Sequence, residues 1–242
     1  MPALEVHEVS VRFGGTRALQ DVNITVEPGS VTGLIGPNGA GKTTLFNVVT
    51  GLLSPSGGRV RLHDRDVTGA TPARRARMGL ARTFQRLELF TSLSVRDNIR
   101  VAGDIRNGWG RGHRINVAKE TERVLELTGL GDIAGRDVAD IPTGRARVVE
   151  VARALMTQPT VLLLDEPAAG QTEQETETFG QLLGRLAADG LAICLVEHDM
   201  ALVMRVSGIL HVLDYGQILA VGRPEQIQND PAVIAAYLGG AA

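Results

Sequence analysis

The stretch that most constrains the fold of this chain is Gly36-Pro37-Asn38-Gly39-Ala40-Gly41-Lys42-Thr43-Thr44. It fits the pattern G-x-x-x-x-G-K-[ST], in which a glycine-rich turn between a strand and a helix holds phosphate groups. The flanking residues agree with this, because Val31–Ile35 is typical of a short buried strand and Leu45–Val49 continues as an apolar helix face. The sequence therefore predicts an α/β core with a phosphate loop.

Each residue type in this stretch has a physical reason to be there. Glycines let the backbone approach the phosphates without a Cβ atom in the way, and N–H groups converge on the anion at the helix N-terminus. Lys42 is expected to neutralise the β- and γ-phosphates, and the Thr43 hydroxyl to bind Mg²⁺. The residues expected to bind the nucleotide are Phe13, Gly36, Asn38, Gly39, Ala40, Gly41, Lys42, Thr43 and Thr44.

Composition excludes several other classes of protein. The net charge of −2 and the aromatic content of 3% argue against nucleic-acid binding. No apolar run approaches the length of a membrane span, and the N-terminus shows no secretory signal. The single cysteine, Cys194, fits a reducing compartment and is expected to be a small core residue.

The hydrophobic pattern predicts how the chain is divided. Apolar and polar residues alternate in Leu4–Phe13 and Val22–Val26, which indicates antiparallel strands with one wet face. The runs Val161–Leu164 and Leu191–Val196 are continuously apolar, as in strands of a parallel sheet that are buried on both faces. Helical spacing dominates residues 92–141.

We therefore expect a P-loop NTPase core with a mostly parallel sheet, an N-terminal antiparallel β subdomain and a helical insert. A single domain is predicted over residues 1–242, with 1–91 and 142–242 as the nucleotide-binding core and 92–141 as the helical subdomain. A loop is expected between two helices of this insert, at residues 107–113.

Two shorter stretches carry local predictions. Thr71 is expected to cap a helix that begins at Pro72, and the arginines of that helix are expected to form a solvated face. These arginines are Arg74, Arg75 and Arg77. Leu80–Gln85 is interpreted as a further strand, with Gln85 at its end.

Polar side chains follow the predicted parallel strands. Asp165 and Glu166 come directly after Val161–Leu164, and His198 follows the next apolar strand. Ligands of open α/β sheets lie at the carboxyl ends of the strands, so these groups should meet beside the phosphate loop. Asp165 is expected to hold Mg²⁺, Glu166 to polarise an attacking water, and His198 to contact the γ-phosphate. Gln85 could sense Mg²⁺ or the water.

The base that the site accepts is a separate question. Guanine-specific hydrolases carry an Asn-Lys-x-Asp element, and this chain has none. Adenine recognition needs only a stacking surface, which Phe13 could supply at the end of a strand leading toward the phosphate loop. An ordinary core position for Phe13 is the alternative.

Taken together, these motifs resemble the ATP-binding cassette (ABC) family over the whole chain. The phosphate loop, Gln85, a helix start at Gly144, Val161–Glu166 and His198 come in that family's order. The chain also looks like the ATPase subunits of branched-chain amino acid importers. The stretches that carry this closer resemblance are Arg82–Gln85, Leu93–Ile99, Asp165–Gly170, Glu197–Met200, Gly222–Ile227 and Ala236–Gly239.

The resemblance implies a mechanism that the patterns alone do not give. Two such domains would close head to tail around two ATP molecules with Mg²⁺, each ATP lying between the phosphate loop of one chain and the signature helix of the other. Closure and reopening would drive a transmembrane permease at the cytoplasmic face of the membrane, with a coupling helix docked near Gln85 and the helical insert. A substrate-binding protein would act only indirectly.

Two departures from the family pattern concern the partner's ATP. The signature usually has the sequence Leu-Ser-x-Gly-Gln, whereas this chain has Ile141, Pro142, Thr143, Gly144 and Arg145. The Ser hydroxyl is gone, the N–H of Gly144 remains, and Arg145 brings a positive charge to the anion site. After Glu166, Gln171-Thr172 stands where Leu-Asp is usual.

The functions left open belong to three classes. The leading one is the ATPase subunit of an ABC importer for branched-chain or related amino acids. The second is an ABC-type ATPase that assembles soluble complexes without a permease. The third is a nucleotide-dependent regulator that does not hydrolyse ATP.

Overall fold

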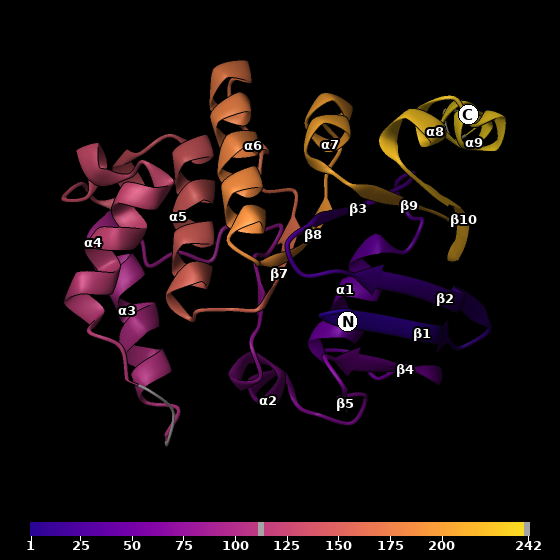
Figure 1. The fold of residues 1–242 in the computed structure, drawn as a ribbon, viewed down its shortest axis with the longest axis horizontal. Coiled ribbons are helices and arrows are strands. Elements are labelled where there is room, and N and C mark those ends of the chain that lie inside the picture. The colour runs from indigo at the N-terminus through magenta and orange to yellow at the C-terminus, as the bar shows by residue number, and fades with distance from the viewer. Residues whose placement is uncertain (111–113, 240–242) are drawn as a thin grey trace.

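The computed structural model describes residues 1–110 and 114–239, which form two β-sheets and the helices packed against them (Figure 1). The larger sheet has six strands in the order β10-β9-β3-β8-β7-β6. Its parallel strands are β3 (Val31–Ile35), β6 (Leu80–Arg82), β7 (Val161–Asp165), β8 (Ala192–Val196) and β9 (Ile209–Asp214). β10 (Gln217–Gly222) pairs antiparallel with β9 at one edge.

The smaller sheet is antiparallel, with the order β2-β1-β4-β5. Its strands are β1 (Leu4–Phe13), β2 (Thr16–Val26), β4 (Gly57–Leu62) and β5 (Arg65–Asp66). The predicted alternation holds in β1 for Leu4–Val6 and for Val9–Arg12, and a register shift between Val6 and Val9 leaves His7 and Glu8 both exposed. β2 begins six residues before the predicted start at Val22, because its ladder with β1 continues to the pair Phe13 and Thr16 beside the turn.

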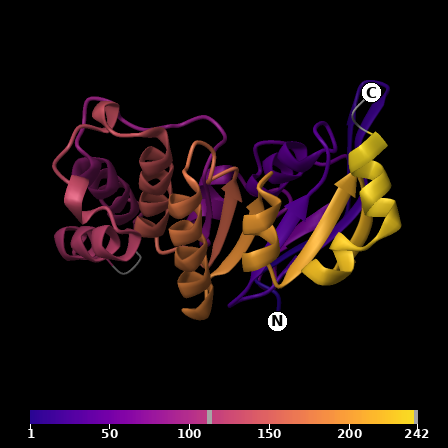
Figure 2. The same cartoon turned by 90° about the horizontal axis from the view of Figure 1, so that it is seen from above.

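Helices cover both faces of the parallel sheet (Figures 1 and 2). α1 (Lys42–Thr50) lies between the two sheets, whereas α5 (Thr143–Met156), α6 (Glu173–Ala188) and α7 (Met200–Val206) cover the other face. Outside α5 lie α3 (Val95–Asn107), α4 (Val117–Thr128) and the 3-10 turns Gly131–Ile133 and Val138–Asp140. The remaining helices are α2 (Pro72–Arg77), α8 (Pro224–Gln228) and α9 (Pro231–Gly239).

The continuous apolar runs are explained by this layering. In β7, Val161 and Leu163 pack toward α1 and the antiparallel sheet, while Leu162 and Leu164 pack toward α5 and α6. Cys194 of β8 lies in the same cluster as α1, where complete burial raises the pKa of its thiol to about 12. Successive strand residues alternate between faces, so both faces of a covered sheet must be apolar.

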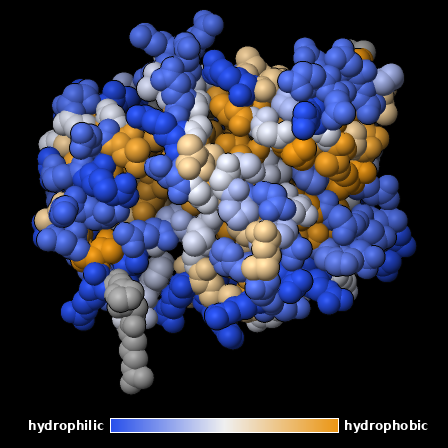
Figure 3. Space-filling view, in the orientation of Figure 1, coloured by the Kyte–Doolittle hydropathy of each residue, from blue (hydrophilic) through white to orange (hydrophobic). Residues whose placement is uncertain are grey.

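The surface is mainly hydrophilic, with separate apolar patches (Figure 3). One patch lies over β9 and β10, where Ile209, Leu219 and Val221 are 40%, 40% and 53% exposed. Throughout the described ranges, every helix is too short or too polar to cross a bilayer.

Two local predictions were wrong. β6 ends at Arg82, so Gln85 lies in a loop beyond the strand; the carbonyls of Phe84 and Gln85 accept hydrogen bonds from Arg147 of α5 and not from a neighbouring strand. Thr71 does cap α2, but Arg75 is buried and not solvated. Its guanidinium donates to the carbonyls of Val48, Val49, Thr68 and Ala70, which fastens α2 to the end of α1.

Candidate nucleotide site

The phosphate loop joins β3 to α1 and depends on glycine at two positions. Gly36 has φ +150°, and a Cβ atom there would lie 1.9 Å from the Leu213 carbonyl oxygen. Gly41, the residue that precedes α1, has φ +111°, and a Cβ atom would lie 2.8 Å from Leu19. Because the first N–H groups of a helix have no partner within it, the start of α1 is free to bind an anion.

Lys42 is held inside this loop. Its ammonium donates to the carbonyls of Gly36 (2.6 Å) and Pro37 (2.9 Å), and the residue is 7% exposed. Burial lowers the pKa of Lys42, and the nearby charges of Glu166 and Asp165 oppose that shift. The structure thus places this cation close to both predicted carboxylates. Asn38 and Gly39 are exposed in the turn, and Thr43 and Thr44 lie in the first turn of α1.

The three groups predicted to act on the γ-phosphate and the water meet at one oxygen. Oε1 of Glu166 accepts from Nε2 of Gln85 (3.0 Å) and lies 2.9 Å from Nε2 of His198. They come from loops after β6, β7 and β8, so the carboxyl ends of three neighbouring strands deliver them. Glu166 has φ +50°, a left-handed conformation that turns the chain sharply after Asp165.

Asp165 has a partner that the sequence reasoning missed. Its Oδ2 lies 2.8 Å from Nη2 of Arg82, and both side chains are almost completely buried. Arg82 also donates to Asn47 of α1 (2.7 Å), and its guanidinium stacks against the rings of Phe46 (5.3 Å) and Phe84 (5.0 Å). This arginine therefore holds the end of β7 against α1 and the start of the Gln85 loop.

The helix that carries the signature residues contacts the loop after Glu166. Pro142 precedes α5, Thr143 is its first residue, and a Cβ atom on Gly144 would lie 2.9 Å from Cγ of Gln171 and 3.1 Å from the Gly170 carbonyl oxygen. Arg145 pairs with Asp132 (2.5 Å) and donates to the Gly129 carbonyl (3.1 Å). Its charge, expected at the anion site, is thus paired within the chain.

A second connection runs from α5 to the Gln85 loop. Arg147 donates to the carbonyls of Phe84 (2.8 Å) and Gln85, and it pairs with Glu150 (3.1 Å), which accepts from the N–H of Glu88 (2.9 Å). Burial raises the pKa of Glu150, and its hydrogen bonds and Arg147 oppose the shift. The spacing of Arg147 and Glu150 on one helix face could have predicted their ion pair, but it does not point to the Gln85 loop, which is more than 60 positions away.

Phe13 is 53% exposed at the end of β1, so it is not a core residue. Its ring is available for stacking, the role that the sequence analysis favoured. Within residues 1–110 and 114–239, no cationic side chain lies over this ring.

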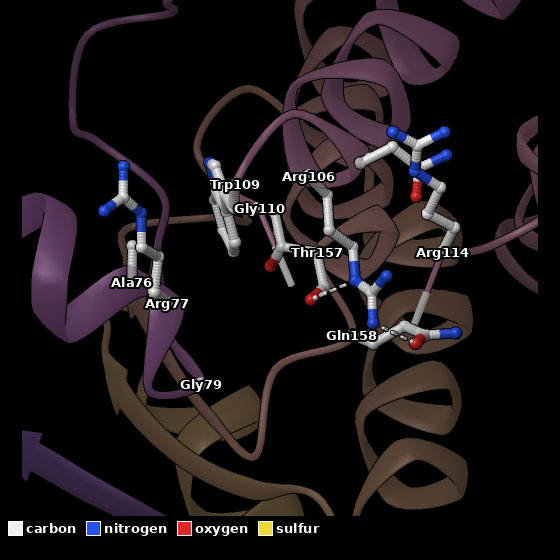
Figure 4. Close-up of a pocket in the computed structure, with 10 residues that line it drawn as sticks. Ala76, Arg77, Gly79, Arg106, Trp109, Gly110, Arg114, Thr157 and Gln158 are labelled. Carbon is white, nitrogen blue, oxygen red and sulfur yellow. Dashed lines mark hydrogen bonds between the residues drawn. The ribbon is translucent and has the colours of Figure 1, made fainter. Parts of the chain in front are cut away.

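An apolar groove lies beside β6, next to the helices α3 and α5. It consists of two adjoining hollows that share Phe84, with Trp109 lining one and Ile105 the other. Phe84 and Ile105 are 41% and 52% exposed. Figure 4 shows the adjoining hollow, with Arg77 and Trp109 on one side and Arg106 and Arg114 on the other. Arg106 donates to the Thr157 carbonyl (3.1 Å) and to Gln158 (2.7 Å). Part of the predicted loop at residues 107–113, namely 111–113, lies outside the described residues.

The phosphate loop and the polar groups at three strand ends define a P-loop nucleotide hydrolase. Comparison with family models identifies the family within this class of hydrolases. A family model described as "ABC transporter" matches residues 19–169, and one described as "Branched-chain amino acid ATP-binding cassette transporter" matches residues 217–242.

Individual relatives agree along almost the whole chain. The chain is 40% identical over 250 residues to the high-affinity branched-chain amino acid transport ATP-binding protein LivG of Escherichia coli (strain K12), with 98% of both proteins covered. It is 39% identical, with the same coverage, to BraF of Pseudomonas aeruginosa. The ADP conformation of an ATP-binding cassette from an ABC transporter superposes with a TM-score of 0.88, at 32% identity over 99% of each chain.

The chain belongs to the ABC transporter family and is one of its ATPases. The fold class and the family resemblance predicted from the sequence are confirmed.

Proposed function

We propose that this chain hydrolyses ATP to drive a separate membrane permease that imports branched-chain amino acids or related compounds. The observation that carries the chemistry is the convergence of Gln85 and His198 on Oε1 of Glu166, beside Lys42. The names of LivG and BraF and the match over residues 217–242 support the substrate class.

The nucleotide would be held by backbone and side chain together. N–H groups at the start of α1 and the ammonium of Lys42 bind the phosphates. The exposed ring of Phe13 stacks on the adenine. Gly36, Asn38, Gly39, Ala40, Gly41, Thr43 and Thr44 complete this set.

Glu166 would act as the base toward water. Gln85 and His198 occupy its Oε1, and Oε2 has no hydrogen-bond partner among the described residues. Oε2 is therefore free to accept the proton of the attacking water, while His198 contacts the γ-phosphate and Gln85 orients the water. The two contacts to Oε1 fix the carboxylate before substrate binds, which lowers the cost of reaching the reactive geometry.

Mg²⁺ fits the donors present. Thr43, Gln85 and Asp165 offer oxygen atoms, which Mg²⁺ prefers, and only Oδ2 of Asp165 is engaged by Arg82. The ion would neutralise phosphate charge, and Thr43 and Asp165 would hold it beside the start of α1.

The partners follow from the same proposal. A second ABC ATPase would supply its signature helix to this chain's ATP, and residues 142–145 would serve the partner's ATP. The permease would dock its coupling helix in the groove beside Gln85. The chain would then lie peripherally at the cytoplasmic face of the membrane, as one domain with a core (1–91 and 142–242) and a helical subdomain (92–141). Neither nucleic acid nor direct contact with a substrate-binding protein is part of this function.

Phosphate release by the purified chain and co-purification from membranes test the proposal together. We expect Mg-ATP-dependent release and a polytopic membrane protein as partner. Release with only soluble partners would support an assembly ATPase instead. Nucleotide binding without release would support a regulator.

A further inference from the structure

Glu197 is a buried carboxylate that the proposed mechanism does not use. It follows β8 and is 6% exposed, and among the residues that the structure describes no cation forms an ion pair with it. Burial raises the pKa of this carboxyl, and hydrogen bonds from backbone N–H groups oppose that shift. Burying a carboxylate costs free energy unless its oxygens accept hydrogen bonds.

Both oxygens of Glu197 accept from segments that carry reacting groups. Oε1 accepts from the N–H of Ala168 at 2.7 Å, and Ala168 lies two residues after Glu166. Oε2 accepts from the N–H of His198 at 3.0 Å. One side chain therefore bridges the loop after β7 and the loop after β8.

This bridge lies where the sheet no longer holds the two strands together. The β7–β8 ladder ends at the pair Asp165 and Val196, followed by one bond from the N–H of Glu166 to the Val196 carbonyl (2.9 Å). Beyond that bond, in residues 1–110 and 114–239, the two loops are joined by the hydrogen bond from the Ala168 N–H to Glu197 and by the contact between Glu166 and His198, while the bond from the His198 N–H orients the Glu197 side chain within its own loop.

The loop that Glu197 holds also reaches the signature helix. The carbonyl of Ala168 accepts from the N–H of Gln171 (3.1 Å), and Gln171 lies against Gly144 of α5. A shift of Ala168 would therefore change the positions of both Glu166 and the start of α5.

We infer that Glu197 is a positioning residue that fixes the distance between Glu166 and His198 and ties both to the loop that contacts α5. The inference rests on the proposed ATP hydrolysis. In the proposed mechanism Glu197 contacts neither nucleotide nor water and acts through the backbone of the residues that do. Misplacing a reacting group by about 1 Å costs on the order of 100-fold in rate, so such a bridge has a measurable effect.

The test is the variant Glu197→Gln, which keeps the size of the side chain. Its amide has only one oxygen, so its N–H₂ group would face one of the two backbone N–H donors and that hydrogen bond would be lost. We expect kcat for ATP to fall by roughly 10- to 100-fold, since the two reacting side chains lose their fixed separation. KM for ATP should change by less than about threefold, because the phosphate loop is untouched. Amide hydrogen exchange at Ala168 and His198 should accelerate.

The matched control is Glu177→Gln on the exposed face of α6, which should leave kcat and both amides unchanged. Glu197→Thr, whose side chain is too short to reach Ala168, should reproduce the loss. Unchanged kcat and exchange in both Glu197 variants would overturn the inference. Unfolding of both at 25 °C would also overturn it, since the carboxylate would then serve the fold alone. An inactive wild type would refute the proposed function, and amide exchange would still test Glu197.

Discussion

The carboxyl edge of the parallel sheet and the start of α5 would each bind the phosphates of an ATP, but they are built in different ways. At the sheet edge the chemistry lies in side chains, with Glu166, Gln85 and His198 meeting at one oxygen. At the start of α5 it lies in the backbone, with the helix N-terminus and Gly144 pressed against Gln171. A backbone site tolerates changes of side chain that a side-chain site does not.

This difference explains where the sequence departs from the family pattern. Pro142 and Arg145 replace a Ser and a Gln, yet the helix still begins there and still offers its N–H groups. Arg145 is paired with Asp132, so its charge is partly neutralised.

Glu166→Gln removes the base from the side-chain site, and we expect the largest effect from it. Phosphate release should fall by about 100-fold or more, the usual cost of losing general-base catalysis, while ATP still binds. Single-turnover phosphate release measures the first and equilibrium binding the second. Glu177→Gln is the control, and a variant that retains a tenth of wild-type release would exclude Glu166 as the base.

Arg82→Met tests the buried ion pair beneath the same site. It leaves the Asp165 carboxylate buried without its partner, so the free energy of unfolding should fall by about 3–5 kcal/mol. Urea denaturation measures this. Arg74→Met on the exposed side of α2 should cost less than about 0.5 kcal/mol. Equal effects of the two variants would mean that Arg82 contributes little to stability.

Gly144→Ala tests the backbone site directly. Its new methyl group would lie 2.9 Å from Gln171 and 3.1 Å from the Gly170 carbonyl, so α5 or the loop must shift. We expect a roughly 10-fold loss of ATPase activity in the assembled dimer, given the sensitivity of rates to position. Gly184→Ala in α6 is the control, because a Cβ atom there meets nothing within 4 Å. A loss of the same size in both variants would refute a special role for Gly144.

Restoring the signature with Pro142→Ser and Arg145→Gln should have the smallest effect. Turnover of the assembled complex should rise by about threefold or less, because one hydroxyl adds to N–H groups already present. Steady-state ATPase assays at saturating ATP measure this. A rise of 30-fold would mean that the natural residues impair the partner's site, as in an asymmetric heterodimer with a sister ATPase. No rise would mean that the changes are tolerated.

The convergence at Glu166 could be predicted because it follows from a local pattern. Asp165 and His198 each come just after an apolar run, and parallel strands bring such positions to one edge. The residues that hold this edge in place could not be found in the same way. Arg82 and Asp165 are 83 positions apart, and Glu150 and Glu88 are 62 apart, with nothing local to connect them. The burial of Arg75 could not be predicted either, because its neighbours Arg74 and Arg77 indicated a solvated face.

The sequence alone determined the phosphate loop, the parallel strands and the order of the polar groups at their ends, because backbone periodicity and glycine requirements are local properties. Which charges are buried, and which partners they have, depends on how the elements fold together. Arg82 pairs with Asp165, Arg145 pairs with Asp132, and Glu197 accepts from two backbone N–H groups. Burying a charge is favourable only when a partner from elsewhere in the chain arrives at hydrogen-bond distance. Which residue arrives there is decided by how the elements pack.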